Sequence, residues 1–247
     1  MITIKTDQEI EILCEGGKKL SRILNKIAEA TKPGITENDL EKLARKLILE
    51  EGAKPSFLGF EGYPAALCIS TNEEVVHGIP TNRVIKNGDI VGLDCGIWYK
   101  GLCTDMAMTV GVGEISPKAA KLIMVTRNSL ESAIREMHVG KYLGDIGFAV
   151  QNYVESRGFS VVRELVGHGV GKKVHEAPQV PNYGKKSTGL ELKEGMVLAV
   201  EPMVNVGTWR VKTLPDNWTF VTADGELSAH FEHTIAITKN GPLVITK

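Results

Sequence analysis

The chain has 247 residues, of which 43% are hydrophobic and 24% charged, and its formal net charge is −1. This balance is that of an ordinary globular protein and argues against an extended surface for nucleic acids or anionic membranes. No stretch approaches the roughly 20 apolar residues that a membrane span needs. The opening segment turns acidic at Asp7 and offers no apolar signal core, so we expect a cytoplasmic protein with no membrane and no specific nucleic-acid partner.

The first part of the chain predicts two helices. Thr6 is a suitable N-cap, and apolar residues recur at helical spacing from there to the stop signal "KPG" at residues 32–34. Thr36 and Asp39 resemble a capping box, with Asp in place of the usual Glu, and open a second helix that ends at Gly52. Strands and turns are predicted to follow over residues 57–113.

The middle of the chain predicts a second pair of helices. Ser116 is a suitable N-cap, and Pro117 suits the first position of a helix that reaches about Met137. A fourth helix is predicted over roughly residues 143–157. From residue 160 onward, β-rich runs are broken by Gly, Pro and Asn.

The two helix pairs suggest an internal repeat. A shift of 106 residues places Gly34 on Gly140 and Gly52 on Gly158. Shared helix-capping signals would also produce such a match. We expect one α+β catalytic domain over residues 1–247, with a pseudo-repeat of about 1–110 and 111–247.

The segment "DCGIWYKGLCTD", residues 94–105, has an aspartate at each end of an otherwise apolar hairpin. If Tyr99-Lys100 forms a two-residue turn, Asp94 lies directly opposite Asp105, while a bulged turn at Gly101 would slip this register by about one residue. Two carboxylates at that range repel unless a proton or a metal ion lies between them. The segment is therefore either a solvated acidic hairpin end or part of a cation site.

Two further acids occupy unusual positions. Glu201 ends the apolar run "GMVLAV", and Glu232 in "AHFEHTIAIT" falls where strand alternation predicts a buried face. Each alone is more commonly a charge at a strand end. His168 stands between glycines in "VGHGVG", which permits close backbone approach to a ligand. Four acids with one histidine match the oxygen-rich ligand set of a two-metal centre.

Other catalytic patterns find no support. The four cysteines contain no C-x-x-C pair, so zinc-finger spacing is excluded and free thiols are expected. "GHGVG" is followed by "KKVHEAP" instead of a helix, so it is not a phosphate-binding loop. No G-x-S-x-G elbow and no Cys-His nucleophile motif is present.

Six segments together resemble the short type I methionine aminopeptidases of peptidase family M24, and the match runs nearly end to end. They are "KPGIT", "GYPAALCISTNEEVVHGIP", "GDIVGLDCGIWYKGLCTD", "VGHGVGKKVHEAPQVPNY", "GMVLAVEPM" and "FEHT". The resemblance implies the pita-bread fold, two pseudo-symmetric α+β halves that cup a dinuclear metal site. It also implies two divalent ions, cobalt, manganese, iron or zinc, held by Asp94, Asp105, His168, Glu201 and Glu232.

The same resemblance assigns roles to the remaining site residues. Glu201 is the general base and proton shuttle, His175 stabilises the oxyanion, and His77 contacts the scissile amide nitrogen or the leaving group. The substrate-binding residues are Phe57, Phe60, Tyr63, Cys68, His77, His175 and Trp218. His230 replaces a frequent glutamine of the family and is either a supporting residue of the site or merely structural. The backbones of Asn72, Glu74 and Ser228 match a monovalent-cation site.

The implied activity is removal of the initiator methionine from nascent polypeptides when the second residue is small, with the ribosome as a further partner and a monomeric enzyme. An X-Pro aminopeptidase or prolidase is the first alternative, although such enzymes carry a further N-terminal domain for which 247 residues leave no room. "HGIP" and Trp218 also favour methionine. A catalytically inactive binding module is the second alternative, but such relatives lose ligands, whereas this chain keeps all five.

Overall fold

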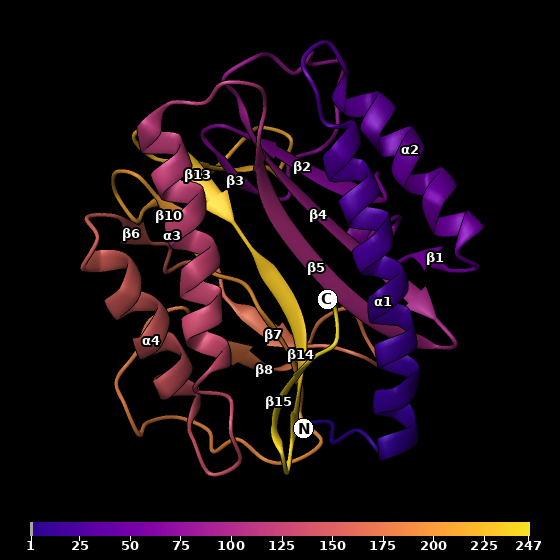
Figure 1. The fold of residues 1–247 in the computed structure, drawn as a ribbon, viewed down its shortest axis with the longest axis vertical. Helices are drawn as coiled ribbons and strands as arrows, with labels where there is room; N and C mark the ends of the chain where they lie inside the picture. Colours follow the sequence, from indigo (N-terminus) through magenta and orange to yellow (C-terminus); the bar gives the residue numbers. More distant parts are fainter. Residues whose placement is uncertain (1) are drawn as a thin grey trace.

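The computed structural model describes residues 2–247, and Met1, the first residue of the predicted domain, lies outside the described residues. Two pairs of helices lie at opposite sides of the molecule, and long strands run between them (Figure 1). The helices are α1 (Asp7–Ala30), α2 (Glu37–Glu50), α3 (Pro117–Ile134) and α4 (Leu143–Glu155), with a 3₁₀ turn η1 (Phe60–Gly62).

The predicted helix starts are confirmed by their capping bonds. The Thr6 hydroxyl accepts the Glu9 N–H at 3.2 Å while the Glu9 carboxylate accepts the Thr6 N–H at 2.8 Å, which closes a capping box. Ser116 Oγ accepts the Ala119 N–H at 3.1 Å, directly before Pro117. Local side-chain chemistry therefore sets where these helices begin.

A nine-stranded antiparallel sheet forms the centre of the fold. Its order is β1-β4-β5-β14-β9-β7-β8, with β2 paired to β4 and β15 paired to β14. Two three-stranded sheets, β13-β10-β6 and β11-β12-β3, complete the β structure. The strands are β1 (Lys54–Pro55), β2 (Leu67–Thr71), β3 (Glu74–Val76), β4 (Ile90–Tyr99), β5 (Leu102–Gly111), β6 (Ser160–Val161), β7 (Gly167–Gly169), β8 (Glu176–Val180), β9 (Val197–Val200), β10 (Met203–Asn205), β11 (Val211–Thr213), β12 (Phe220–Thr222), β13 (Ser228–His230), β14 (Glu232–Thr238) and β15 (Gly241–Val244).

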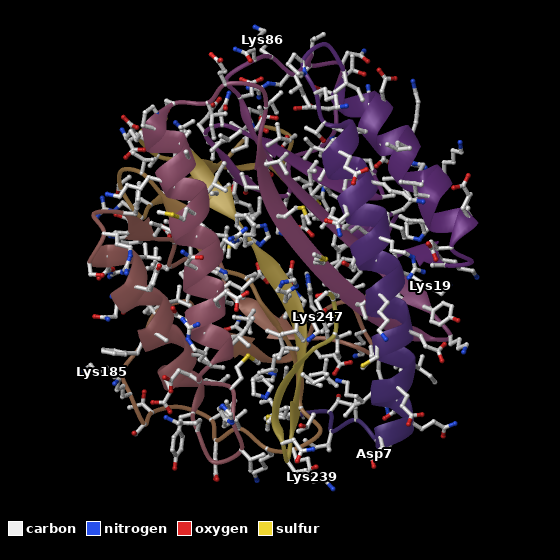
Figure 2. The ribbon with its side chains drawn as sticks, in the orientation of Figure 1. Asp7, Lys19, Lys86, Lys185, Lys239 and Lys247 are labelled. Carbon is white, nitrogen blue, oxygen red and sulfur yellow. The ribbon has the colours of Figure 1, made fainter. Side chains whose placement is uncertain are left out.

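The apolar faces of the helices pack on this sheet. Leu24 of α1 and Ile48 of α2 join one buried cluster with strand residue Leu93, and Leu122 of α3 joins a second with Val200. Charged side chains such as Lys86, Lys185 and Lys239 point outward at the periphery (Figure 2). Among residues 2–247, no helix has the length and apolar character needed to cross a bilayer.

The β4–β5 hairpin differs from its predicted register. The turn residues are Lys100 and Gly101, both with positive φ (47° and 82°), so Asp94 pairs with Ala107 and Asp105 pairs with Gly96. The predicted opposition of Asp94 and Asp105 is wrong. The observed partner of Asp94 is Ala107, two residues beyond the predicted partner Asp105. Because side chains on a strand alternate between the two faces, this shift of two residues leaves both aspartates on the same face of the sheet.

One backbone connection occurs twice along the chain. The Gly34 N–H donates to the Ile85 carbonyl at 2.9 Å, and the Gly140 N–H, 106 residues later, donates to the Leu192 carbonyl at 3.0 Å. In both places the glycine has positive φ and precedes a helix of the pair. Each pair of helices is therefore tied by the same kind of bond to the segment that precedes a strand of the central sheet, β4 after Ile85 and β9 after Leu192.

Candidate metal centre

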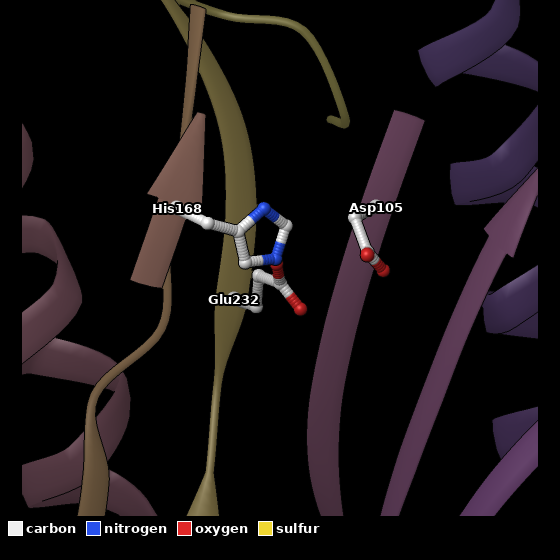
Figure 3. Close-up of side chains that lie close together, drawn as sticks. All are labelled: Asp105, His168 and Glu232. Atoms are coloured by element: carbon white, nitrogen blue, oxygen red, sulfur yellow. The ribbon is translucent and has the colours of Figure 1, made fainter. Parts of the chain in front are cut away.

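Five predicted ligands converge on one face of the central sheet. Asp94 lies on β4, Asp105 on β5, His168 on β7 and Glu232 on β14, and Glu201 directly follows β9. Because β4, β5, β14, β9 and β7 are neighbours in that order, these side chains come together from distant parts of the sequence. Ligand atoms of Asp105, His168 and Glu232 all lie within 4.8 Å of one another (Figure 3).

His168 presents a free ring nitrogen to this cluster. Its Nδ1 donates to the Gly169 carbonyl at 2.9 Å, which leaves Nε2 as the nitrogen with a lone pair. Nε2 lies 3.5 Å from Glu201 Oε1. Burial lowers the pKa of His168 to about 3, so the ring is neutral, the form that binds metals.

The four carboxylates lie together without enough positive charge: Asp94, Asp105 and Glu232 are buried, and the Glu201 side chain is 13% exposed. Burial raises the pKa of Asp94, Asp105, Glu201 and Glu232, and repulsion among the carboxylates raises it further for Asp94, Glu201 and Glu232. Two of their oxygens, Asp94 Oδ1 and Glu232 Oε1, are buried and have no hydrogen-bond partner within residues 2–247. Such unpaired oxygens fit divalent cations, which would bind them and offset the repulsion.

A hydroxyl bridge fixes the central strands. The Asp105 N–H donates to Thr234 Oγ1 at 2.9 Å, and that hydroxyl donates back to the Asp105 carbonyl at 2.8 Å. Thr234 follows Glu232 by two residues on β14, so this pair of bonds sets Asp105 and Glu232 against each other. The site is thus preorganised by backbone contacts that do not involve the ligand atoms themselves.

A cavity opens at this cluster, and all twelve predicted site residues line it. The lining consists of Phe57, Phe60, Tyr63, Cys68, His77, Asp94, Asp105, His168, His175, Glu201, Trp218 and Glu232, together with Glu61.

The cavity walls are aromatic, with a sulfur at the base. The rings of Tyr63 and Trp218 meet edge to face with centroids 5.1 Å apart, and Phe60 meets His175 at the same separation. Cys68 pairs with Asp94 across β2 and β4, which places its thiol beside the carboxylate cluster. These surfaces form an apolar slot whose floor is polar.

Two further histidines border the floor. The His175 ring lies 4.3 Å from the His168 ring, and His77 packs against Phe220 at 5.7 Å. Burial lowers the pKa of His77 to about 4 and also lowers the pKa of His175. Both rings are therefore neutral near pH 7 and keep one N–H to donate.

Residues 11–239 match the family model described as metallopeptidase family M24. The chain belongs to this family.

Relatives within the M24 family match over the full length. A methionine aminopeptidase of Clostridium perfringens is 51% identical, over 100% of this chain and 99% of its own length. Methionine aminopeptidase 1 of Bacillus subtilis is 49% identical, with 100% of both chains covered. The predicted resemblance to methionine aminopeptidases is confirmed.

Solved structures place the fold in the same family. The crystal structure of a Thermotoga maritima methionine aminopeptidase matches with a TM-score of 0.98 and 48% identity over 100% of both chains. An Xaa-Pro dipeptidase of Bacillus anthracis matches with a TM-score of 0.79 and 26% identity, over 99% of this chain but 62% of its own. The predicted α+β pita-bread fold with two halves is confirmed by these matches.

Two residues beside this cluster, Glu61 and Asn182, were not predicted, and the role of a third, His230, was left open. Glu61 stands exposed at the cavity rim with a left-handed φ of 50°, and its charge opposes the lowering of the pKa of His175. His230 Nε2 lies 3.8 Å from Glu201 Oε2, and Asn182 Nδ2 donates to the Glu201 carbonyl at 2.9 Å. His230 therefore lies against a site residue, which favours the supporting role over the merely structural one. The placement of Glu61 between Phe60 and Gly62, beside predicted pocket residues, was the available signal for it.

Proposed function

We propose that this chain is a dinuclear metal-dependent aminopeptidase that removes N-terminal methionine from polypeptides whose second residue is small. One observation carries the proposal. Three buried carboxylates, the partly buried carboxylate of Glu201 and the unpaired Nε2 of His168 gather at the floor of a slot that has aromatic walls and the Cys68 thiol at its base. The relatives that match over the full length at about 50% sequence identity are named methionine aminopeptidases.

The five converging side chains would hold the metal ions. The four carboxylates carry four negative charges when ionised, which two divalent ions balance and one does not. Carboxylate oxygens with one imidazole suit cobalt, manganese, iron or zinc. When bound, the two metal ions would polarise the scissile carbonyl and lower the pKa of the attacking water.

The side chains of the protein then complete the reaction. Glu201 is placed to take the proton of the attacking water and to return it to the amide nitrogen, since its carboxylate lies at the floor beside His168. The neutral His175 donates its N–H to the oxygen on which charge develops. His77, also neutral, contacts the amide nitrogen or the leaving group.

The aromatic slot selects the first side chain of the substrate. Phe60, Tyr63 and Trp218 offer ring faces and edges to a thioether, and each sulfur–aromatic contact contributes roughly 0.3 to 1.5 kcal/mol. The free α-amino group of the substrate would lie near the metal ions, so that only the first residue is removed. The substrates would then be the N-termini of nascent polypeptides at the ribosome. The enzyme would be monomeric and cytoplasmic, with a single catalytic domain that spans the chain.

The remaining element of the proposal is a monovalent cation held by backbone carbonyls of Asn72, Glu74 and Ser228. The Ser228 N–H donates to the Asn72 carbonyl at 2.9 Å, so two of these three segments are adjacent. Asn72 has a left-handed φ of 61°.

A peptide cleavage assay after chelation and stepwise metal addition tests the proposed function. Peptides beginning Met-Ala should be cleaved only after Mn²⁺, Fe²⁺, Co²⁺ or Zn²⁺ is restored, while Met-Leu peptides remain intact. Faster turnover of Ala-Pro than of Met-Ala peptides would move the assignment to the X-Pro enzymes. Metal binding without any cleavage would indicate a binding module.

A further inference from the structure

A buried ion pair holds the loop that carries His175, and we propose that Lys5 positions His175 through this pair. The inference rests on the proposed function, because it assigns a positioning residue to that site. Lys5 lies in the extended segment before α1, away from the residues that line the cavity. It would act on catalysis without touching substrate or metal.

Glu176 closes the loop on itself. It directly follows His175 at the start of β8, and its Oε1 accepts the backbone N–H groups of Lys172 and, at 3.1 Å, of Lys173. One carboxylate oxygen thus binds both residues at the tip of the loop. The loop shape that presents His175 depends on this oxygen being in place.

Lys5 holds the other oxygen. Its Nζ lies 2.6 Å from Glu176 Oε2, and the two side chains are 1% and 5% exposed. The Lys5 backbone N–H donates to the Gly195 carbonyl at 2.8 Å, so the lysine is fixed to the body of the protein. At Gly171 a Cβ would lie 2.6 Å from Lys5 Cε, which means that the lysine stem packs directly on the loop backbone.

Removal of the cation would release the loop. A buried carboxylate without its partner either takes up a proton or turns toward water. In both cases the N–H groups of Lys172 and Lys173 lose a charged acceptor. The His175 ring would then leave its contacts with His168 and Phe60, while the metal ligands on the strands stay where they are.

The same loop offers a matched control. Lys172 Nζ lies 2.8 Å from Glu9 Oε1, in an ion pair whose side chains are 51% and 23% exposed. Exposed ion pairs of this kind contribute little to the stability of the folded protein. Lys172→Met removes one lysine and one ion pair, as Lys5→Met does, but leaves Glu176 paired.

Steady-state kinetics of the metal-saturated protein on a Met-Ala peptide test the inference. Lys5→Met should lower kcat by about 10- to 100-fold with KM and metal content unchanged, because the oxyanion donor is misplaced. Lys172→Met should stay within about twofold of the parent. In a His175→Ala background, Lys5→Met should lower kcat no further, since both changes remove the same contribution. Glu176→Gln, which keeps the side-chain shape without the charge, should lower kcat in the same way and replaces Lys5→Met if that variant does not fold.

Limited trypsin digestion separates this inference from the proposed function. Cleavage after Lys173 should be faster in Lys5→Met than in the parent, whether or not the parent cleaves Met-Ala peptides. Parent-like kcat with a protected loop would overturn the role of Lys5. An equal loss of kcat with and without His175 would overturn it as well, because the effect would then not act through that ring.

Discussion

The floor and the walls of the cavity are held by different kinds of structure. Asp94, Asp105 and Glu232 on the floor lie within strands of the nine-stranded sheet, with a hydrogen-bonded neighbour on each side. The aromatic walls come from loops and the 3₁₀ turn η1, and His77 beside the floor has a left-handed φ of 59°. Paired strands can hold carboxylates close together although these repel one another, whereas loops can be shaped to surround a ligand. Changes to the floor should therefore abolish activity, and changes to the walls should have graded effects.

The largest effect is expected at the floor. Asp105→Ala should lower kcat/KM by at least about 10³-fold and remove bound metal, because its carboxylate lies within 4.8 Å of the ligand atoms of both His168 and Glu232. The fold should persist, since the change relieves repulsion among the four clustered acids. Activity, metal content and circular dichroism measure the three outcomes, with Glu114→Ala, an exposed acid, as control. Full activity in Asp105→Ala with unchanged metal content would refute its role as a metal ligand.

At the edge between floor and wall, His175→Ala should be less severe. We expect kcat to fall by about 10²- to 10³-fold, the usual effect of losing one oxyanion donor. Metal content should not change, because His175 lies beside the ligands and is not one of them. The exposed neighbour Lys173→Ala serves as control. Loss of metal in His175→Ala would make the residue part of the floor instead.

Within the wall, Trp218→Ala should change selectivity more than rate. KM for a Met-Ala peptide should rise by about 2- to 10-fold, because the sulfur loses an aromatic neighbour. The preference for methionine over norleucine, which has no sulfur, should shrink. The two KM values, measured side by side, give this ratio. An unchanged ratio would assign Trp218 a packing role only.

The smallest effect concerns stability of the metal-free protein. Burial raises the pKa of Asp105 from 3.8 to about 7 and raises that of the other three acids, so the folded state binds protons more tightly than the unfolded state. Proton binding by these acids therefore stabilises the folded state fully below pH 4, and this stabilisation is lost as the pH rises through 7. The Tm of the chelated protein should fall by about 5 °C or more between pH 5 and pH 8. The Tm of the metal-loaded protein should fall less over the same range, and an equal fall in both forms would show that these four acids do not cause the pH dependence.

The sequence predicted what depends on local chemistry and on strand alternation. Thr6 and Ser116 act as N-caps as expected, and Glu232 lies on the buried face that alternation assigned to it. The hairpin register could not be fixed in advance, because two adjacent residue pairs, Tyr99-Lys100 and Lys100-Gly101, can each form a two-residue turn. The shared face of the aspartates survived this error only because the change in register was even.

Such sequence patterns do not predict the residues of the pocket walls or the contacts that support the site. Phe60, Tyr63 and Trp218 carry no local signal that separates a pocket from ordinary core, so only the family resemblance pointed to them. The Lys5–Glu176 pair joins residues 171 positions apart, and no periodicity predicts a contact of that kind. The fold and the convergence of four acids with His168 were thus predictable from the sequence, whereas the contacts that hold these side chains in position appear only in the folded structure.

Anomalous diffraction from crystals loaded with Mn²⁺ tests the paired metal centre most directly. We expect two peaks about 3.5 to 4 Å apart among the carboxylates of Asp94, Asp105, Glu201 and Glu232 and the imidazole of His168. No peak among these side chains, or a single peak at saturating Mn²⁺, would contradict it.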